Sequence, residues 1–194
     1  MAIQHTYQAQ SVDGGVAFML DDPALLPDDP TEALTEEQKA GSLGVLTDTG
    51  LSKGITRTSN VEKDFDGADY VTTQSEYSGL FKFTLFDVGL ERVKQMLYGD
   101  ENVTFTPADE THGNQYHVEH NADQLPIKPF FFLTKSGKKR ELMVVENGRV
   151  DEIGEQVHKG GESTKVDVTI RASKNSNNNY IEEYGDDGEV VVTP

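Results

Sequence analysis

Cysteine is absent from the 194 residues of this chain. Without thiols, the protein cannot form disulfide bonds, bind zinc through thiolates, hold an iron–sulfur cluster or use a cysteine nucleophile. Its stability must therefore come from packing.

Long apolar runs are also missing, and hydrophobic residues make up only 35% of the chain. A membrane-spanning helix needs about 20 consecutive apolar residues, so no span is expected. Residues 1–5 have neither the basic start nor the apolar stretch of a secretory signal, which predicts a cytoplasmic origin. A chain of this length is expected to form one domain around one core.

Basic residues are scarce: 17 Lys and Arg stand against 34 Asp and Glu, for a formal net charge of -17. Such a chain repels phosphate backbones instead of releasing their counterions, which argues against tight binding of DNA or RNA. The plain interpretation of this charge is solubility.

From residue 43 onward, short segments rich in Val, Ile, Thr, Phe and Tyr are separated about every ten residues by Gly, Asn or Asp, a texture typical of all-β proteins. Residues 80–86 alternate most clearly, with Phe81, Phe83 and Leu85 on one face. Residues 164–171 alternate in the same way. The other predicted strands span residues 44–47, 52–58, 70–77, 102–106, 115–120 and 130–134.

A hairpin is predicted near the middle of the second half of the chain. Residues 142–145 are apolar at every position, and Asn147 and Gly148 separate them from a further segment at 149–153. Asn-Gly is a preferred dipeptide of two-residue hairpin turns. The sequence therefore predicts that the chain reverses at Asn147 and Gly148.

Residues 90–98 alone have a clear helical period: Leu90, Val93 and Leu97 fall at i, i+3 and i+7, and Gly99 follows. Asp87 is the expected N-cap. A helix with one apolar stripe covers one face of a sheet. The predicted fold class is therefore mainly β, a β-sandwich or barrel with one α-helix packed on the sheet.

Composition divides the chain into three predicted parts. Residues 1–42 form an N-terminal arm with an acidic loop, residues 43–171 form the β-sandwich domain, and residues 172–194 form a polar, Asn-rich linker and a C-terminal arm. The arm ends in Val190, Val191 and Val192. Three successive valines at a chain end require a partner strand, because an exposed apolar strand invites pairing.

The acidic segment from Glu62 to Gly67 is the best candidate for a binding site. It places acids at alternate positions before a glycine, as a calcium loop does, but Thr73 stands where the bidentate Glu should be. An acidic hairpin tip is the favoured interpretation, and structural calcium is the alternative.

Catalytic and cofactor signatures are missing. His112, His117 and His120 are badly spaced for a metal triad on a strand. The chain contains no G-x-S-x-G motif and no phosphate loop. The basic cluster at Lys135 and 138–140 lies beside Gly137 and predicts a hairpin tip, not a nucleic-acid patch. We therefore expect no enzymatic activity, no cofactor and no bound metal.

The order of segments over residues 42–106 resembles that of the tail tube (major tail) proteins of long-tailed, siphovirus-like viruses. The matching segments are the strand and turn at 43–51, the acidic loop at 59–69, the strands at 70–76 and 81–85, the helix at 90–98 and the strand at 103–105.

This resemblance implies a structural virion protein that assembles with itself into hexameric rings. In the family, such rings stack into a hollow tube through which viral DNA passes without tight binding. The implied partners are further copies of the chain, the tail terminator, the baseplate or tip, and the tape measure protein. The implied location is the virion tail, after assembly in the host cytoplasm.

Two surfaces are expected to join the copies. Asp64, Phe65 and Asp66 are predicted to contact the adjacent ring, and Val190, Val191 and Val192 are predicted to add a strand to a neighbouring subunit. Two alternatives remain open at the level of sequence. One is a non-enzymatic β-sandwich binding module with a calcium loop; the other is a tail terminator or a contractile-tail tube protein.

Overall fold

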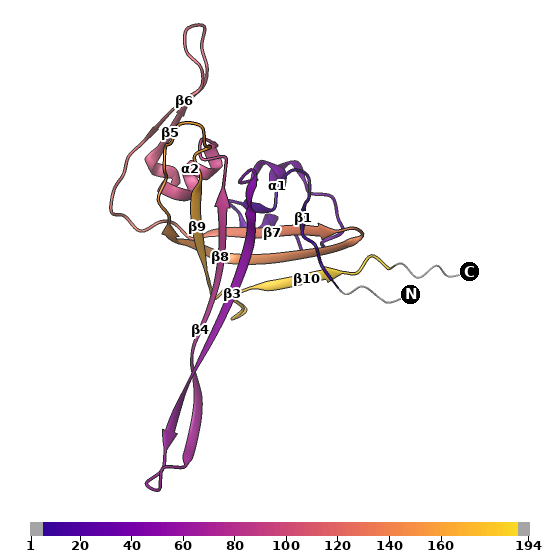
Figure 1. The fold of residues 1–194 in the computed structure, drawn as a ribbon, viewed down its shortest axis with the longest axis vertical. Coiled ribbons are helices and arrows are strands. Elements are labelled where there is room, and N and C mark those ends of the chain that lie inside the picture. Colours follow the sequence, from indigo (N-terminus) through magenta and orange to yellow (C-terminus); the bar gives the residue numbers. More distant parts are fainter. Residues whose placement is uncertain (1–5, 190–194) are drawn as a thin grey trace, which may run out of the picture.

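Residues 6–189 are described by a computed structural model of the protein (Figure 1). Its strands are β1 (Gln10–Ser11), β2 (Ala17–Met19), β3 (Leu46–Lys63), β4 (Asp69–Leu85), β5 (Val103–Thr106), β6 (Gln115–Val118), β7 (Lys128–Ser136), β8 (Lys139–Ile153), β9 (Val166–Ser173) and β10 (Glu182–Asp186). Its helices are α1 (Glu36–Ala40) and α2 (Glu91–Tyr98), with short 3-10 turns η1 (Pro23–Leu25) and η2 (Asp100–Asn102).

One large antiparallel sheet organises the described chain. Its strand order is β1-β7-β8-β9-β4-β3, with β2 paired to β7 beside β1 and β10 paired to β8 beside β9. Strands β5 and β6 form a separate hairpin. The predicted mainly β fold class is confirmed. Across residues 6–189, no helix is both long and apolar enough to cross a membrane.

The core lies on both faces of the central β7–β8 hairpin. On one face, Phe132 and Met143 pack with β4, β9 and helix α2. On the other, Phe131 and Leu142 pack against the segment that contains β2. Because side chains alternate across a strand, this two-sided burial explains why residues 142–145 are apolar throughout.

Helix α2 confirms the predicted helix, and its buried stripe includes Val93 and Leu97. It ends as expected at Gly99, which has a φ of 87° and whose N–H donates to the carbonyl of Gln95. The predicted N-cap was wrong. Leu90 holds that position, while the carboxylate of Asp87 accepts the backbone N–H of Val45 at 2.7 Å.

Several predicted strands merge into longer ones. The segments at 44–47 and 52–58 fall largely within the single strand β3, and those at 70–77 and 80–86 fall largely within β4. The two strands pair over almost their whole length, with register shifts that include residues 47–50. The predicted acidic hairpin tip between them is confirmed at residues 64–68.

The predicted reversal at Asn147 and Gly148 was wrong, because strand β8 continues straight through both residues. Gly148 pairs with Lys128 on one side and Ala172 on the other. A Cβ added at Gly148 would lie 2.4 Å from Cδ2 of Phe130. The glycine is therefore needed for close packing of the Phe130 ring, and the actual turn lies at Gly137, where the basic hairpin tip was predicted.

Replacing Gly148 with alanine should test this explanation. We expect the overpacked variant to lose about 1–3 kcal/mol of unfolding free energy, measured by urea denaturation. Gly54→Ala is the matched control, since a Cβ there meets nothing within 4 Å. Equal stability of the two variants would contradict the packing role of Gly148.

The terminal segments contribute to the same sheet. Ala17 and Met19 are buried in the core, and β10 pairs with β8 through residues 182–186. The three-part division of the chain stays a prediction. Strands β2 and β10 lie in the two parts that flank residues 43–171, and both pair with strands inside that range.

Candidate assembly surfaces

The most prominent feature is a long two-stranded arm, residues 52–76, formed by the distal parts of β3 and β4 (Figure 1). Every residue in this arm is exposed. A lone two-stranded ribbon is at best marginally stable in water. Because its residues are exposed, both faces of the arm remain available for contact.

The arm carries apolar side chains that nothing in the described chain covers. They are Ile55, Val61, Phe65, Tyr70 and Val71. Phe65, at the tip, is fully exposed. Large apolar residues gathered on a projecting element mark interaction sites, whereas scattered single ones do not.

The three predicted contact residues have different roles at the tip. The carboxylate of Asp64 accepts backbone N–H groups from Asp66 at 3.0 Å and Ala68 at 2.8 Å, and Gly67 has a φ of 84°. Asp64 therefore shapes the turn. Phe65 and Asp66 are left facing solvent.

The base of the arm is held by an aromatic and cationic stack that sequence reasoning missed. The ring of Tyr77 lies 4.4 Å from that of Tyr180; the guanidinium of Arg57 lies over the Tyr77 ring and the ammonium of Lys174 over the Tyr180 ring. Lys53 also forms an ion pair with Glu183 at 2.6 Å. These contacts join β3 and β4 to residues about a hundred positions away, so no local pattern signals them.

The outer edge of β3 is a second surface. The strand stands last in the order of the large sheet, so β4 pairs with one of its edges and no strand of residues 6–189 pairs with the other. An open edge presents unpaired N–H and C=O groups to another chain. Strand β3 therefore contributes to both surfaces.

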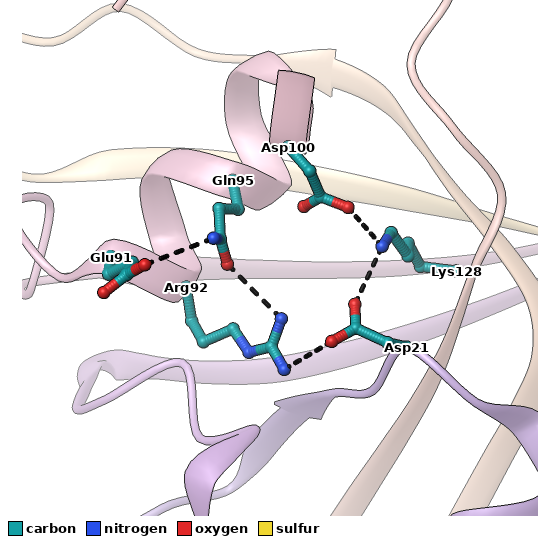
Figure 2. A network of polar contacts seen from close by, with 6 residues as sticks. All are labelled: Asp21, Glu91, Arg92, Gln95, Asp100 and Lys128. Atoms are coloured by element: carbon teal, nitrogen blue, oxygen red, sulfur yellow. Dashed lines mark hydrogen bonds and ion pairs between the residues drawn. The ribbon is translucent and has the colours of Figure 1, made fainter. Parts of the chain in front are cut away.

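A polar network fastens helix α2 to the rest of the fold (Figure 2). Arg92 and Lys128 each contact the carboxylate of Asp21 at 2.8 Å, and Lys128 also pairs with Asp100. Gln95 extends the network along the helix to Glu91. The hydrogen bond from Arg92 lowers the pKa of Asp21 most, burial opposes the shift and Lys128 adds to it, so the pKa falls to about 2.

This shift gives a pH prediction for Asp21→Asn. Because the folded pKa is below the ordinary 3.8, the carboxylate stabilises the fold above about pH 4, and its contribution is lost as the pH falls toward 2. For a half-exposed group we expect about 1 kcal/mol at neutral pH. Urea denaturation at pH 7 and pH 2.5 should show the variant's deficit shrink, whereas the exposed Asp123→Asn control should show no deficit at either pH.

The remaining predicted residues are dispersed. The ring of His120 packs edge-on against Tyr98 at 4.6 Å, while His112 bonds to its neighbour Thr111. Among residues 6–189, no group of three or more His, Asp or Glu side chains is placed to hold a metal ion. Val190, Val191 and Val192 lie outside the described residues.

Comparison with known proteins adds a relationship of fold. No family model and no curated protein sequence matches the chain. Among solved structures, it is similar to the sheath/tube terminator of an extracellular contractile injection system (PVC) in its extended state, with a TM-score of 0.50 and 9% identity, covering 94% of this chain and 99% of that one. It also matches the tube-terminating cap of the anti-feeding prophage (AFP), with a TM-score of 0.46 and 12% identity over 84% and 95% of the two chains.

At 9% identity, the first likeness is one of fold. The chain shares the fold of a protein described as a sheath/tube terminator, whereas its resemblance to the siphovirus tail tube subunit rests on the order of sequence segments.

Proposed function

We propose that this protein is a non-enzymatic structural component of a phage-like tail, and that copies of it form a closed ring that terminates the tail tube. The observation that carries the proposal is the end-to-end likeness to a tube terminator, which leaves almost no part of either chain unmatched. The exposed arm and the open β3 edge support assembly independently.

Ring closure accounts for these exposed features. A sheet edge is a liability in a monomer, and a head-to-tail contact repeated around a ring leaves no edge free. The arm projects away from the body of the sheet (Figure 1). Asp64 holds the turn while Phe65 faces outward, which is the geometry of a contact point.

The net charge of -17 is compatible with this role. A ring around a DNA path must not hold the duplex, and an acidic surface repels phosphate. On this proposal, the ring is hexameric, resides in the virion tail and contacts the last tube subunits.

A second candidate is the tube subunit itself. It is favoured by the order of segments over residues 42–106. The two roles differ in one respect: a tube subunit stacks on its own rings without limit, whereas a terminator forms a ring that stacks on a different protein.

Negative-stain electron microscopy of the purified chain tests the proposal. We expect single closed rings of uniform diameter. Long hollow tubes would favour the tube subunit instead. A species that remains monomeric at high concentration, as measured by sedimentation velocity, would overturn both roles.

A further inference from the structure

Two opposite edges of the large sheet line one groove. The first wall comes from residues 7–16, which contain β1, and the second from residues 44–51, which contain the start of β3. Thr134, Glu141 and Met143 of the β7–β8 hairpin complete the lining. We call this space, about 590 Å³, the edge groove.

The edge groove is lined mainly by apolar side chains and edge backbone. Val16, Val45, Leu46 and Leu51 lie along its walls, and Val45 is 54% exposed. Its volume falls in the range of sites that bury a ligand.

The walls come from the two ends of the strand order, and no strand of residues 6–189 bridges β1 and β3 across the groove, although Val12, Gly15, Val16 and Val45 already have backbone hydrogen-bond partners. Between the pairs Leu46↔Leu85 and Leu51↔Phe83, residues 47–50 have no Cα partner on β4. On the opposite wall, β1 pairs with β7 through two residues only. A slot between two strand edges fits an added β-strand.

The chain itself supplies a strand of suitable chemistry. Strand β10 runs toward the β7–β8 turn, and Gly188 lies against Lys138 of that turn. Five residues follow Glu189, and three of them are the valines 190–192. β-Branched side chains fit a pleated, half-buried surface, and five extended residues reach at most about 16–18 Å.

A neighbouring copy is the better donor. Strand β10 pairs with the edge of β8, whereas the edge groove lies beyond the opposite edge of the hairpin, on the β1 side of β7. A chain entering its own groove would have to reverse around the β7–β8 turn.

We propose that Val190, Val191 and Val192 of one copy add a strand to the edge groove of the next copy, an inference that rests on the proposed ring. The contact joins two different surfaces, so repetition around an axis closes a ring where the rotation between neighbouring copies divides a full turn. In this contact, the C-terminal segment of one copy binds against the N-terminal wall of the groove of the next copy.

The absence of cysteine allows a clean test by disulfide crosslinking. Val191→Cys and Val45→Cys are made as separate variants, mixed, oxidised mildly and separated on a non-reducing gel. We expect a covalent dimer that needs both variants. Val157→Cys replaces Val45→Cys as the matched control, because Val157 is equally exposed at 56% but does not line the groove.

The outcomes separate this inference from the ring itself. Equal dimer yield with the Val157 partner would overturn the strand addition. So would a disulfide that forms only within single chains when Val45→Cys and Val191→Cys are combined in one chain. Rings seen by microscopy in those same samples would leave the proposed function standing. Absence of both rings and crosslinks would overturn the two together.

Discussion

Removal of the distal arm is expected to abolish ring formation and leave the protomer folded. The cut removes residues 59–75 and joins Thr58 to Glu76 through Asn-Gly. Thr58 and Glu76 lie directly opposite each other in the hairpin, so a two-residue turn spans the distance between them. The stack of Arg57, Tyr77 and Tyr180 at the arm base is retained.

The expected size of the effect follows from the apolar surface that is lost. Burying Phe65 alone would contribute about 1.5–3 kcal/mol to a contact, and each 1.4 kcal/mol changes an association constant about tenfold. Phe65→Asp should therefore weaken assembly by one to two orders of magnitude, and removal of the arm should weaken it further. Sedimentation velocity over a concentration series measures both.

A matched surface change isolates the arm. Val157→Asp introduces the same charge at an exposed position outside the arm and should assemble normally. The thermal melt of the shortened protomer should match that of the intact chain, since the deleted residues are exposed. Normal rings from the shortened protein would rule out the arm as an assembly surface.

Phe132→Ala is expected to produce the largest loss of stability. The side chain is completely buried, its ring stacks on Phe81 at 4.4 Å, and it meets Phe83 edge-on at 5.9 Å. Truncating a buried phenylalanine costs about 3–5 kcal/mol. For a chain of this size, the melting temperature should fall by about 6–20 °C.

Phe65→Ala provides the same chemical change without burial. Because Phe65 is fully exposed, its removal should alter the unfolding free energy of the monomer by less than about 0.5 kcal/mol. Urea denaturation at a concentration below that of assembly compares the two variants. A similar cost for both would mean that the β4–β7 aromatic packing is not the centre of the core.

Core packing of β4 explains the orientation of the arm. Phe81 and Phe83 fasten the proximal half of β4 to the sheet, and the same strand then continues beyond the core as the arm. Rigid packing at one end of a strand therefore orients its exposed end. A loss of packing at Phe132 should for this reason also reduce assembly, although less directly than the arm variants do.

Local sequence determined the elements whose signals are periodic or conformational. Alternation predicted the buried face of β4, the i, i+3, i+7 spacing predicted helix α2, and the acids around Phe65 predicted a hairpin tip. These predictions succeeded because side-chain period and turn chemistry act over a few neighbouring residues. The mainly β class follows from the same signals.

Tertiary structure alone decided how those elements were used. Asn147 and Gly148 favour a turn locally, yet pairing on both sides of β8 and the close approach of Phe130 keep them extended. Tertiary structure also decided the edge groove and the arm base, because both bring together residues far apart in sequence. Local preferences amount to about 1 kcal/mol, and a strand paired on both edges outweighs them because its many contacts form together.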